Sequence, residues 1–177
     1  RHTRCCIVGG GPAGMMLGYL LGRAGIDTLV LEKHADFFRD FRGDTVHPST
    51  LQVMDELGLT DGFLKLPHQQ LQKMDGSFGG DSIRIADLGR LKVKYPFIAF
   101  MPQWDFLNFL RESGKRFASL KVMMNAAATD LIGSGDSVAG VKVDTPEGLA
   151  AIRADLAVVC GGRHSVWRAR APLAATE

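Results

Sequence analysis

The chain has 177 residues, of which 46% are apolar and 23% charged, and this is enough for a globular domain with a buried core. Its 21 basic and 19 acidic residues leave a net charge of +2, which gives no reason to expect a nucleic-acid partner. The longest candidate for a membrane span, residues 15–21, is far shorter than the roughly 20 apolar residues that a span needs. No signal-peptide pattern opens the sequence, and we expect a cytoplasmic protein.

The three cysteines, Cys5, Cys6 and Cys160, are odd in number and lie in apolar, strand-like segments. Such residues are expected to be buried thiols in a reducing compartment. No spacing of Cys and His residues indicates a metal site.

The first elements in chain order predict a βαβ unit. A buried strand is expected over residues 4–8, a helix over 12–24 that Gly25 closes, and a second strand over 28–31. This order predicts an α/β fold of the Rossmann type, with a parallel sheet that carries helices on both faces.

The middle of the chain changes character. A helix is predicted over residues 48–57 and ends at Gly58. Residues 66–102 alternate apolar and polar side chains, which predicts short antiparallel strands outside the nucleotide-binding part. Helix returns over residues 105–117.

The last third of the chain predicts a β-meander. Strands are expected at residues 121–125, 138–144 and 149–153, separated by Gly and Asp turns. A final apolar strand is expected at residues 156–160.

The glycines between the first strand and the first helix form the pattern G-x-G-x-x-G, with Gly9, Gly11 and Gly14. Gly9 permits the tight turn, Gly11 lets a pyrophosphate approach the backbone, and Gly14 lets the helix and strand pack closely. The helix N-terminus favours negative charge, and Pro12 suits its first turn. The pattern therefore predicts a dinucleotide site.

The second predicted strand ends at Glu32, which lies 18 residues beyond Gly14. A carboxylate at this place can accept hydrogen bonds from the ribose of a dinucleotide. It favours an unphosphorylated ribose, and so FAD or NAD over NADP. These residues alone leave FAD and NAD as alternatives.

Three further stretches carry a family resemblance: "FRGDTVHPSTLQVMDELGL" (41–59), "MPQWDFLNFLRE" (101–112) and "ADLAVVCGGRHSVWRARA" (154–171). Together with the glycine turn, they resemble the class A flavoprotein monooxygenases, the group that includes 4-hydroxybenzoate hydroxylase. The resemblance covers nearly the whole chain and implies FAD as the cofactor.

The resemblance also implies which residues contact FAD. Arg42 matches an arginine that approaches the phosphates and the ribityl chain, and Gln103 matches a polar residue near the ribityl region. The full set of implied cofactor contacts is Gly9, Gly11, Pro12, Ala13, Gly14, Glu32, Lys33, Arg42, Gln103 and Gly162. No residue is predicted to be catalytic.

The chain departs from the family at two places. Members of the family usually read Asp-Gly where this chain has Gly161-Gly162, and the loss of this carboxylate favours FAD binding over turnover. The family also continues into a second half, so the resemblance implies the N-terminal portion of a longer protein. Residues 1–65 and 103–177 are then the FAD-binding domain, and residues 66–102 contribute to an antiparallel sheet on the substrate side.

For the intact enzyme the resemblance implies an FAD-dependent monooxygenase. NADH or NADPH would reduce FAD, and O₂ would form a flavin C4a-hydroperoxide that hydroxylates an aromatic or similar small organic substrate. The alternatives are a truncated FAD-binding module without turnover, or another FAD oxidoreductase of the same scaffold, such as a halogenase or an isoprenoid reductase.

Overall fold

The computed structural model describes residues 1–38, 44–134, 137–162 and 165–167. The chain forms two compact units, Arg1–Phe38 with Leu107–Glu177, and Arg39–Phe106. The helix α4, Gln103–Gly114, begins in the second unit and ends in the first.

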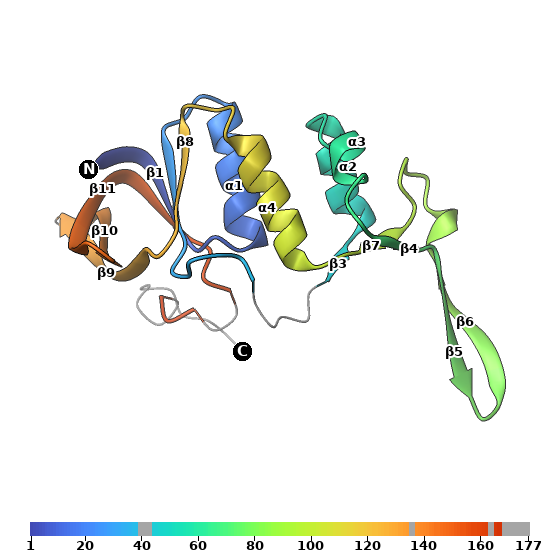
Figure 1. The fold of residues 1–177 in the computed structure, drawn as a ribbon. Coiled ribbons are helices and arrows are strands. Elements are labelled where there is room, and N and C mark those ends of the chain that lie inside the picture. Colours follow the sequence, from blue (N-terminus) through green and yellow to red (C-terminus); the bar gives the residue numbers. More distant parts are fainter. Residues whose placement is uncertain (39–43, 135–136, 163–164, 168–177) are drawn as a thin grey trace. The chain divides into compact units, whose positions relative to one another are not determined.

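The first unit is built on a sheet that has, within the described residues, the strand order β8-β2-β1-β11-β10-β9 (Figure 1). In this order the strands are Leu120–Met123, Thr28–Leu31, His2–Val8, Gly148–Val159, Ser137–Thr145 and Ala127–Ser134. The first four strands are parallel, whereas β10 and β9 continue the sheet in antiparallel pairs. The predicted α/β class with a parallel sheet and a meander is therefore confirmed.

The strand β11 corrects the sequence-based division of this region. Residues 149–153 and 156–160 were expected to be separate strands, but Gly148–Val159 is continuous. Its first half pairs antiparallel with β10 up to Arg153, and its second half pairs parallel with β1 from Arg153 to Val159. The strand is long because its two halves pair with different neighbours, β10 and β1. The meander consists of β9, β10 and β11, while the segment predicted at 121–125 is the parallel strand β8.

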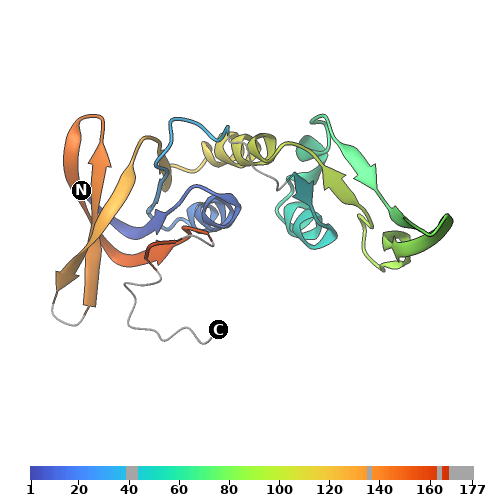
Figure 2. The same cartoon turned by 90° about the horizontal axis from the view of Figure 1, so that it is seen from below.

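One face of this sheet is covered by the helix α1, Pro12–Arg23, as Figure 2 shows. A Cβ atom on Gly18 would lie 2.6 Å from Val30 Cγ2, and one on Gly22 would lie 2.7 Å from Leu120 Cβ. These contacts leave no room for larger side chains, so glycine lets α1 lie directly on β2 and β8.

The opposite face is packed by strands in the described part of the chain. Its core joins β1 and β2 to the meander and contains Cys6, Val8, Leu29, Leu31, Ala126, Val141, Val143, Ile152, Ala154 and Trp167. Helices were expected on both faces of the sheet. Within the described residues a helix covers one face, and the meander packs against the other.

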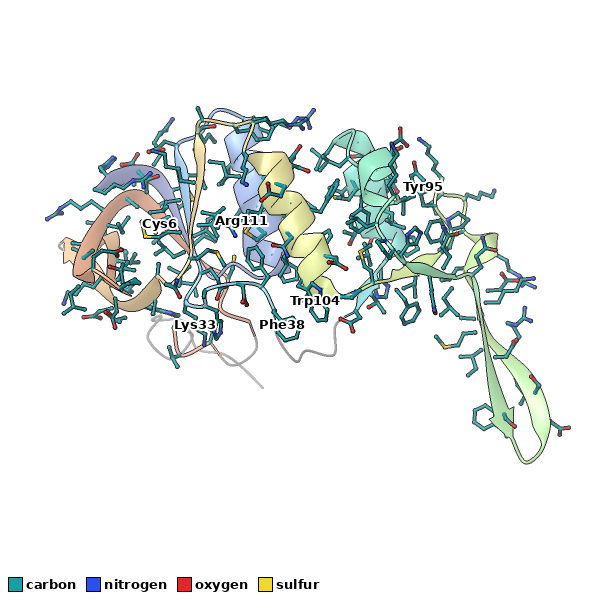
Figure 3. The ribbon with its side chains drawn as sticks, in the orientation of Figure 1. Cys6, Lys33, Phe38, Tyr95, Trp104 and Arg111 are labelled. Carbon is teal, nitrogen blue, oxygen red and sulfur yellow. The ribbon has the colours of Figure 1, made fainter. Side chains whose placement is uncertain are left out.

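All three cysteines are free thiols, as expected, and Cys6 lies inside the sheet of the first unit (Figure 3). Cys5 and Cys6 are buried, whereas Cys160 is half-buried. Burial raises the pKa of Cys6 to about 12 and also raises the pKa values of Cys5 and Cys160. The three side chains therefore stay protonated at neutral pH.

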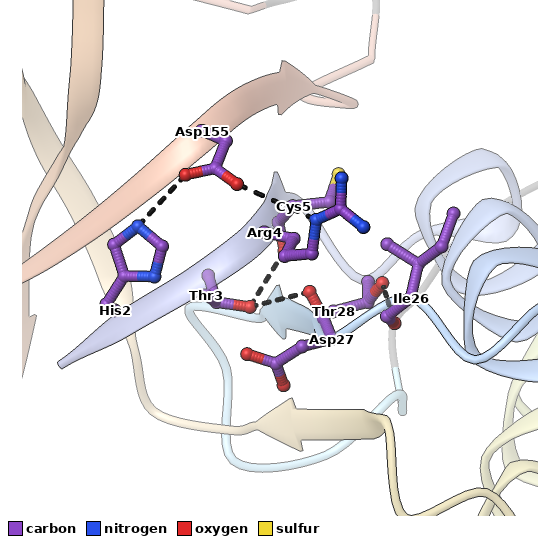
Figure 4. Close-up of polar contacts among 8 residues, drawn as sticks. All are labelled: His2, Thr3, Arg4, Cys5, Ile26, Asp27, Thr28 and Asp155. Carbon is purple, nitrogen blue, oxygen red and sulfur yellow. Dashed lines mark hydrogen bonds and ion pairs between the residues drawn. The ribbon is translucent and has the colours of Figure 1, made fainter.

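Polar contacts hold the beginning of β1 in register with its neighbours (Figure 4). The Thr3 hydroxyl donates to the carbonyl oxygen of Asp27 at 2.8 Å, and the backbone N–H of Cys5 donates to the same oxygen at 3.0 Å. On the other side, His2 Nε2 lies 3.0 Å from an Asp155 carboxylate oxygen. The register that follows pairs Val8 with Leu31 and with Val159, so three parallel strands end at one edge.

The second unit contains two helices, a small sheet and a hairpin in its described residues. The helices are α2, Pro48–Glu56, and α3, Thr60–Phe63. The small sheet has the order β3-β7-β4, with Thr45–Val46, Ile98–Phe100 and Gln69–Leu71. The hairpin joins β5, Lys73–Phe78, to β6, Asp81–Asp87, and the short helix η1, Leu88–Arg90, follows. The predicted short antiparallel strands are therefore present, while α3 was not predicted.

The hairpin is polar on one side and apolar on the other. Phe78 and Ile85 pack over Gly76, since a Cβ on this glycine would lie 2.8 Å and 2.6 Å from them, yet they remain 60% and 56% exposed. Asp75 and Arg84 form an ion pair across the two strands. A two-stranded ribbon is marginally stable alone, and the exposed apolar side of this hairpin offers a surface on which another part of the protein can pack.

A hydrogen-bonded triad ties the segment before β7 to α2. Lys94 Nζ and the Tyr95 hydroxyl both donate to Asp55 Oδ1, at 2.8 Å and 2.9 Å. The hydrogen bond from Lys94, followed by that from Tyr95, lowers the pKa of Asp55 below its ordinary value of 3.8. The ionised carboxylate is thus the form that the folded unit prefers.

The triad predicts a pH-dependent contribution to stability. Because the folded-state pKa of Asp55 is depressed, its contribution is present above pH 3.8 and is lost as the pH falls through the folded-state pKa. We expect Asp55→Ala to lower the thermal midpoint at about pH 6, and the difference from the parent to shrink towards about pH 3. The control is Asp61→Ala, which removes an exposed acid from α3. A difference that stays constant over this pH range would contradict the prediction.

Candidate functional site

The candidate site lies at the edge where β1, β2 and β11 end together. The Gly9 N–H donates to the Leu31 carbonyl oxygen at 2.9 Å, and the Cys160 N–H donates to the Val8 carbonyl oxygen at 2.7 Å. The glycine turn therefore leaves β1 between the ends of its two neighbours. This is the edge at which parallel α/β sheets bind ligands.

Two of the glycines are required by the packing of the turn itself. Gly9 has φ = 113°, and a Cβ on it would lie 2.5 Å from the Cys160 carbonyl oxygen. A Cβ on Gly14 would lie 1.9 Å from the Gly9 carbonyl oxygen. Both distances are far below van der Waals contact, so any side chain would force these backbones apart.

Gly11 differs from them because its surroundings are open. No atom of the described residues lies within 4 Å of the place where its Cβ would be, and its φ of −72° suits any residue. It is the N-cap of α1, no side chain caps this helix end, and the next residues, Pro12 and Ala13, are exposed. A helix N-terminus lined by backbone N–H groups fits a diphosphate.

Glu32 joins the turn from the end of β2. Its side chain is only 2% exposed, and Oε2 accepts the Gly10 N–H at 3.0 Å while Oε1 accepts the His34 N–H at 3.0 Å. A carboxylate offers about four acceptor sites, so it can hold N–H groups of the turn and hydroxyl groups of a ribose together. Glu32 thus lies against the turn.

Sequence reasoning missed the part that Gly10 plays. The motif treats this position as variable, yet a Cβ on Gly10 would lie 2.8 Å from Glu32 Cβ. The run of three glycines, with Gly10 between the two motif positions, was the available signal. Gly10 lets the carboxylate approach the backbone closely.

The remaining predicted contacts are spread over the chain. Lys33 is exposed just beyond β2 (Figure 3), and Gly162 is exposed beyond β11 with φ = 72°. Gln103 belongs to the second unit, where it begins α4. Arg42 lies outside the described residues. The first unit therefore brings Gly9, Gly11, Pro12, Ala13, Gly14 and Glu32 together, and the roles of all ten residues stay predictions.

Gly161, at the position where the family resemblance implies an aspartate, lies against Ser165. A Cβ on Gly161 would lie 2.7 Å from Ser165 Oγ and 3.1 Å from Ser165 Cβ. The Ser165 hydroxyl is buried and has no hydrogen-bond partner among the residues that the structure describes. Ser165 therefore occupies space that a side chain at position 161 would need, beside the glycine turn.

The described residues fit a dinucleotide better than a metal ion. In this part of the chain no cluster of three or more His, Cys, Asp or Glu side chains could hold a metal. The open helix N-terminus at Gly11 and the carboxylate of Glu32 instead match the diphosphate and the ribose of a dinucleotide.

None of the described helices has both the length and the apolar character of a membrane span.

Comparison with known proteins agrees with this geometry. A family model described as "FAD binding domain" matches residues 2–177. The 6-methylpretetramide 4-monooxygenase of Streptomyces rimosus is 28% identical, and the match covers 94% of this chain and 40% of that protein. The rifampicin monooxygenase of Streptomyces venezuelae is 31% identical, with 92% and 32% covered. The chain thus spans less than half the length of these relatives.

Solved structures show the same fold. The p-nitrophenol 4-monooxygenase of Pseudomonas putida has a TM-score of 0.84 at 24% identity, with 95% of this chain and 43% of that chain covered. The anhydrotetracycline hydroxylase of Streptomyces rimosus has a TM-score of 0.76 at 30% identity, with 92% and 32% covered.

The contact between positions 161 and 165 can be tested by stability measurements. We expect Gly161→Asp to lower the free energy of unfolding by about 1–3 kcal/mol, because the new side chain overlaps Ser165 Oγ. Ser165→Ala removes an unpaired buried hydroxyl and should cost little. In the Ser165→Ala background the cost of Gly161→Asp should fall, and urea unfolding of the four proteins measures this coupling. Additive effects would contradict the proposed overlap.

Proposed function

Because the chain belongs to the FAD binding domain family, we propose that it is the FAD-binding portion of a monooxygenase. The intact protein would use NADH or NADPH and O₂ to hydroxylate an aromatic or similar small organic substrate. The oxygen-transfer route described above for the class A flavoprotein monooxygenases is part of this proposal, and so is a cytoplasmic location.

The observation that carries the proposal is the open N-terminus of α1 beside the buried carboxylate of Glu32. The backbone from Gly11 to Ala13 would bind the diphosphate of FAD through N–H groups and the helix dipole. Glu32 would accept hydrogen bonds from the adenosine ribose while Gly10 holds it against the turn. These residues bind and orient the cofactor, and FAD supplies the redox chemistry when bound.

Residues outside the turn complete the proposed site. Lys33 and Gly162 follow the strands on either side of β1 and would contact the cofactor near the turn. Arg42 would pair with the phosphates, because a guanidinium forms charge-assisted and bidentate contacts with phosphate. Gln103 would contact the ribityl region.

A domain division accompanies this function. We propose that residues 1–65 and 103–177 serve FAD binding and that residues 66–102 contribute to the substrate side. The apolar side of the β5–β6 hairpin supports the second part, since Phe78 and Ile85 offer exposed apolar surface. An aromatic substrate is supported by the name of the relative 6-methylpretetramide 4-monooxygenase and by that of a para-nitrophenol 4-monooxygenase of Pseudomonas sp., which is 25% identical to this chain.

The nucleotide site is tested by Gly11→Leu. The side chain would enter the open space at the helix N-terminus, so we expect the protein to fold but to lose FAD, seen as the loss of flavin absorbance after purification. Gly133→Leu is the matched control, because Gly133 lies in β9 and also has no atom within 4 Å of its Cβ position. Flavin content of Gly11→Leu equal to that of the control would refute the diphosphate site.

The reaction is tested with the full-length protein, NADH or NADPH, and a panel of phenols that includes p-nitrophenol. The expected balance is that substrate, O₂, NAD(P)H and a proton give hydroxylated substrate, water and NAD(P)⁺. A phenol should accelerate NAD(P)H oxidation, and ¹⁸O₂ should label the product. Bound flavin with no NAD(P)H consumption would select a binding module, and consumption without labelled product would select another FAD oxidoreductase.

A further inference from the structure

Asp44 connects two sequence-distant motifs of the second unit. It directly precedes β3, whose Thr45 pairs with Phe100 of β7, so Asp44 lies beside the chain that leads into α4. Its backbone carbonyl oxygen accepts the Met101 N–H at 3.0 Å. Its side-chain Oδ1 accepts the Gln103 N–H at 3.2 Å, although the two residues are 59 positions apart.

The side-chain contact falls on the first residue of α4. The first N–H groups of a helix have no partner within the helix, and Gln103 begins α4. Asp44 supplies an acceptor for this N–H from outside the helix, and its negative charge is favourable at the positive end of the helix dipole. Asp105 adds a second acid in the same first turn, where its own N–H donates to the Pro102 carbonyl oxygen. Both contacts lie at the first turn of α4.

We propose that Asp44 is a positioning residue for FAD binding that acts through Gln103. This inference rests on the proposed function, in which the Gln103 side chain contacts the ribityl region. The carboxylate holds the backbone N–H of Gln103 and so fixes the place at which this residue begins α4, from which its side chain would reach the cofactor. Asp44 itself does not touch the cofactor in this proposal.

Two substitutions at position 44 separate the loss of the hydrogen-bond acceptor from the loss of the negative charge. Asp44→Ala removes the acceptor, whereas Asp44→Asn keeps a carbonyl oxygen at the same place and removes the charge. We expect Asp44→Ala to raise the Kd for FAD about five- to tenfold, the scale of a lost helix-capping contact. Asp44→Asn should restore most of the affinity. Asp105→Ala is the matched control, since it removes an acid from the same helix turn, and we expect a change below about twofold.

The experiment measures the Kd for FAD by flavin fluorescence in the parent, these variants, Gln103→Ala and the double variant Asp44→Ala/Gln103→Ala. If Asp44 acts through Gln103, the double variant should bind FAD no more weakly than Gln103→Ala alone. A purely structural Asp44 would instead make the two effects multiply. Thermal midpoints show that each protein is folded at the temperature of measurement.

The outcomes separate the inference from the function on which it rests. A parent protein that binds no FAD would overturn the proposed function. FAD binding by the parent together with an unchanged Kd in Asp44→Ala or in Gln103→Ala would overturn the positioning role alone. The same follows if Asp105→Ala weakens binding as much as Asp44→Ala does, because the effect would then be general helix electrostatics.

Discussion

The close approach of backbone segments at the end of β1 is the constraint on which the rest of the site depends. Gly9 touches the Cys160 carbonyl group after β11, and Gly14 touches Gly9. These contacts bring the N-terminus of α1 to the edge of the sheet, where no side chain of the described residues lies within 4 Å of the Cβ position of Gly11. Glu32 then reaches the turn through the Gly10 N–H. The same close glycine contacts that pack the turn therefore also place the groups proposed to bind the dinucleotide.

The βαβ unit was predictable because its signals are local. The strand at residues 28–31, the start of α1 at Pro12 and the glycine after its C-cap, Gly25 with φ = 75°, all follow from short-range chemistry. The family resemblance added FAD, which spacing alone could not separate from NAD. The place of Glu32 beside the turn also agrees with the 18-residue spacing from Gly14.

The parts that sequence reasoning missed depend on contacts between distant residues. Ser165 matters because it lies against Gly161, and Asp44 because β3 pairs with β7 beside the start of α4. The continuous strand β11 was divided because local alternation does not show that one strand has two partners. Strand register and side-chain packing determine these three contacts, and no sequence motif predicts them.

The position of β1 between β2 and β11 has a consequence for how the protein is made. On the ribosome, β1 and β2 emerge early, whereas residues 153–159, which pair with the other side of β1, are synthesised near the end of this chain. Until then one edge of a strongly apolar strand, with Cys5, Cys6 and Ile7, lacks its neighbour. An unpaired edge of this kind favours pairing with another chain, so the late synthesis of residues 153–159 leaves a period in which intermolecular pairing competes with folding.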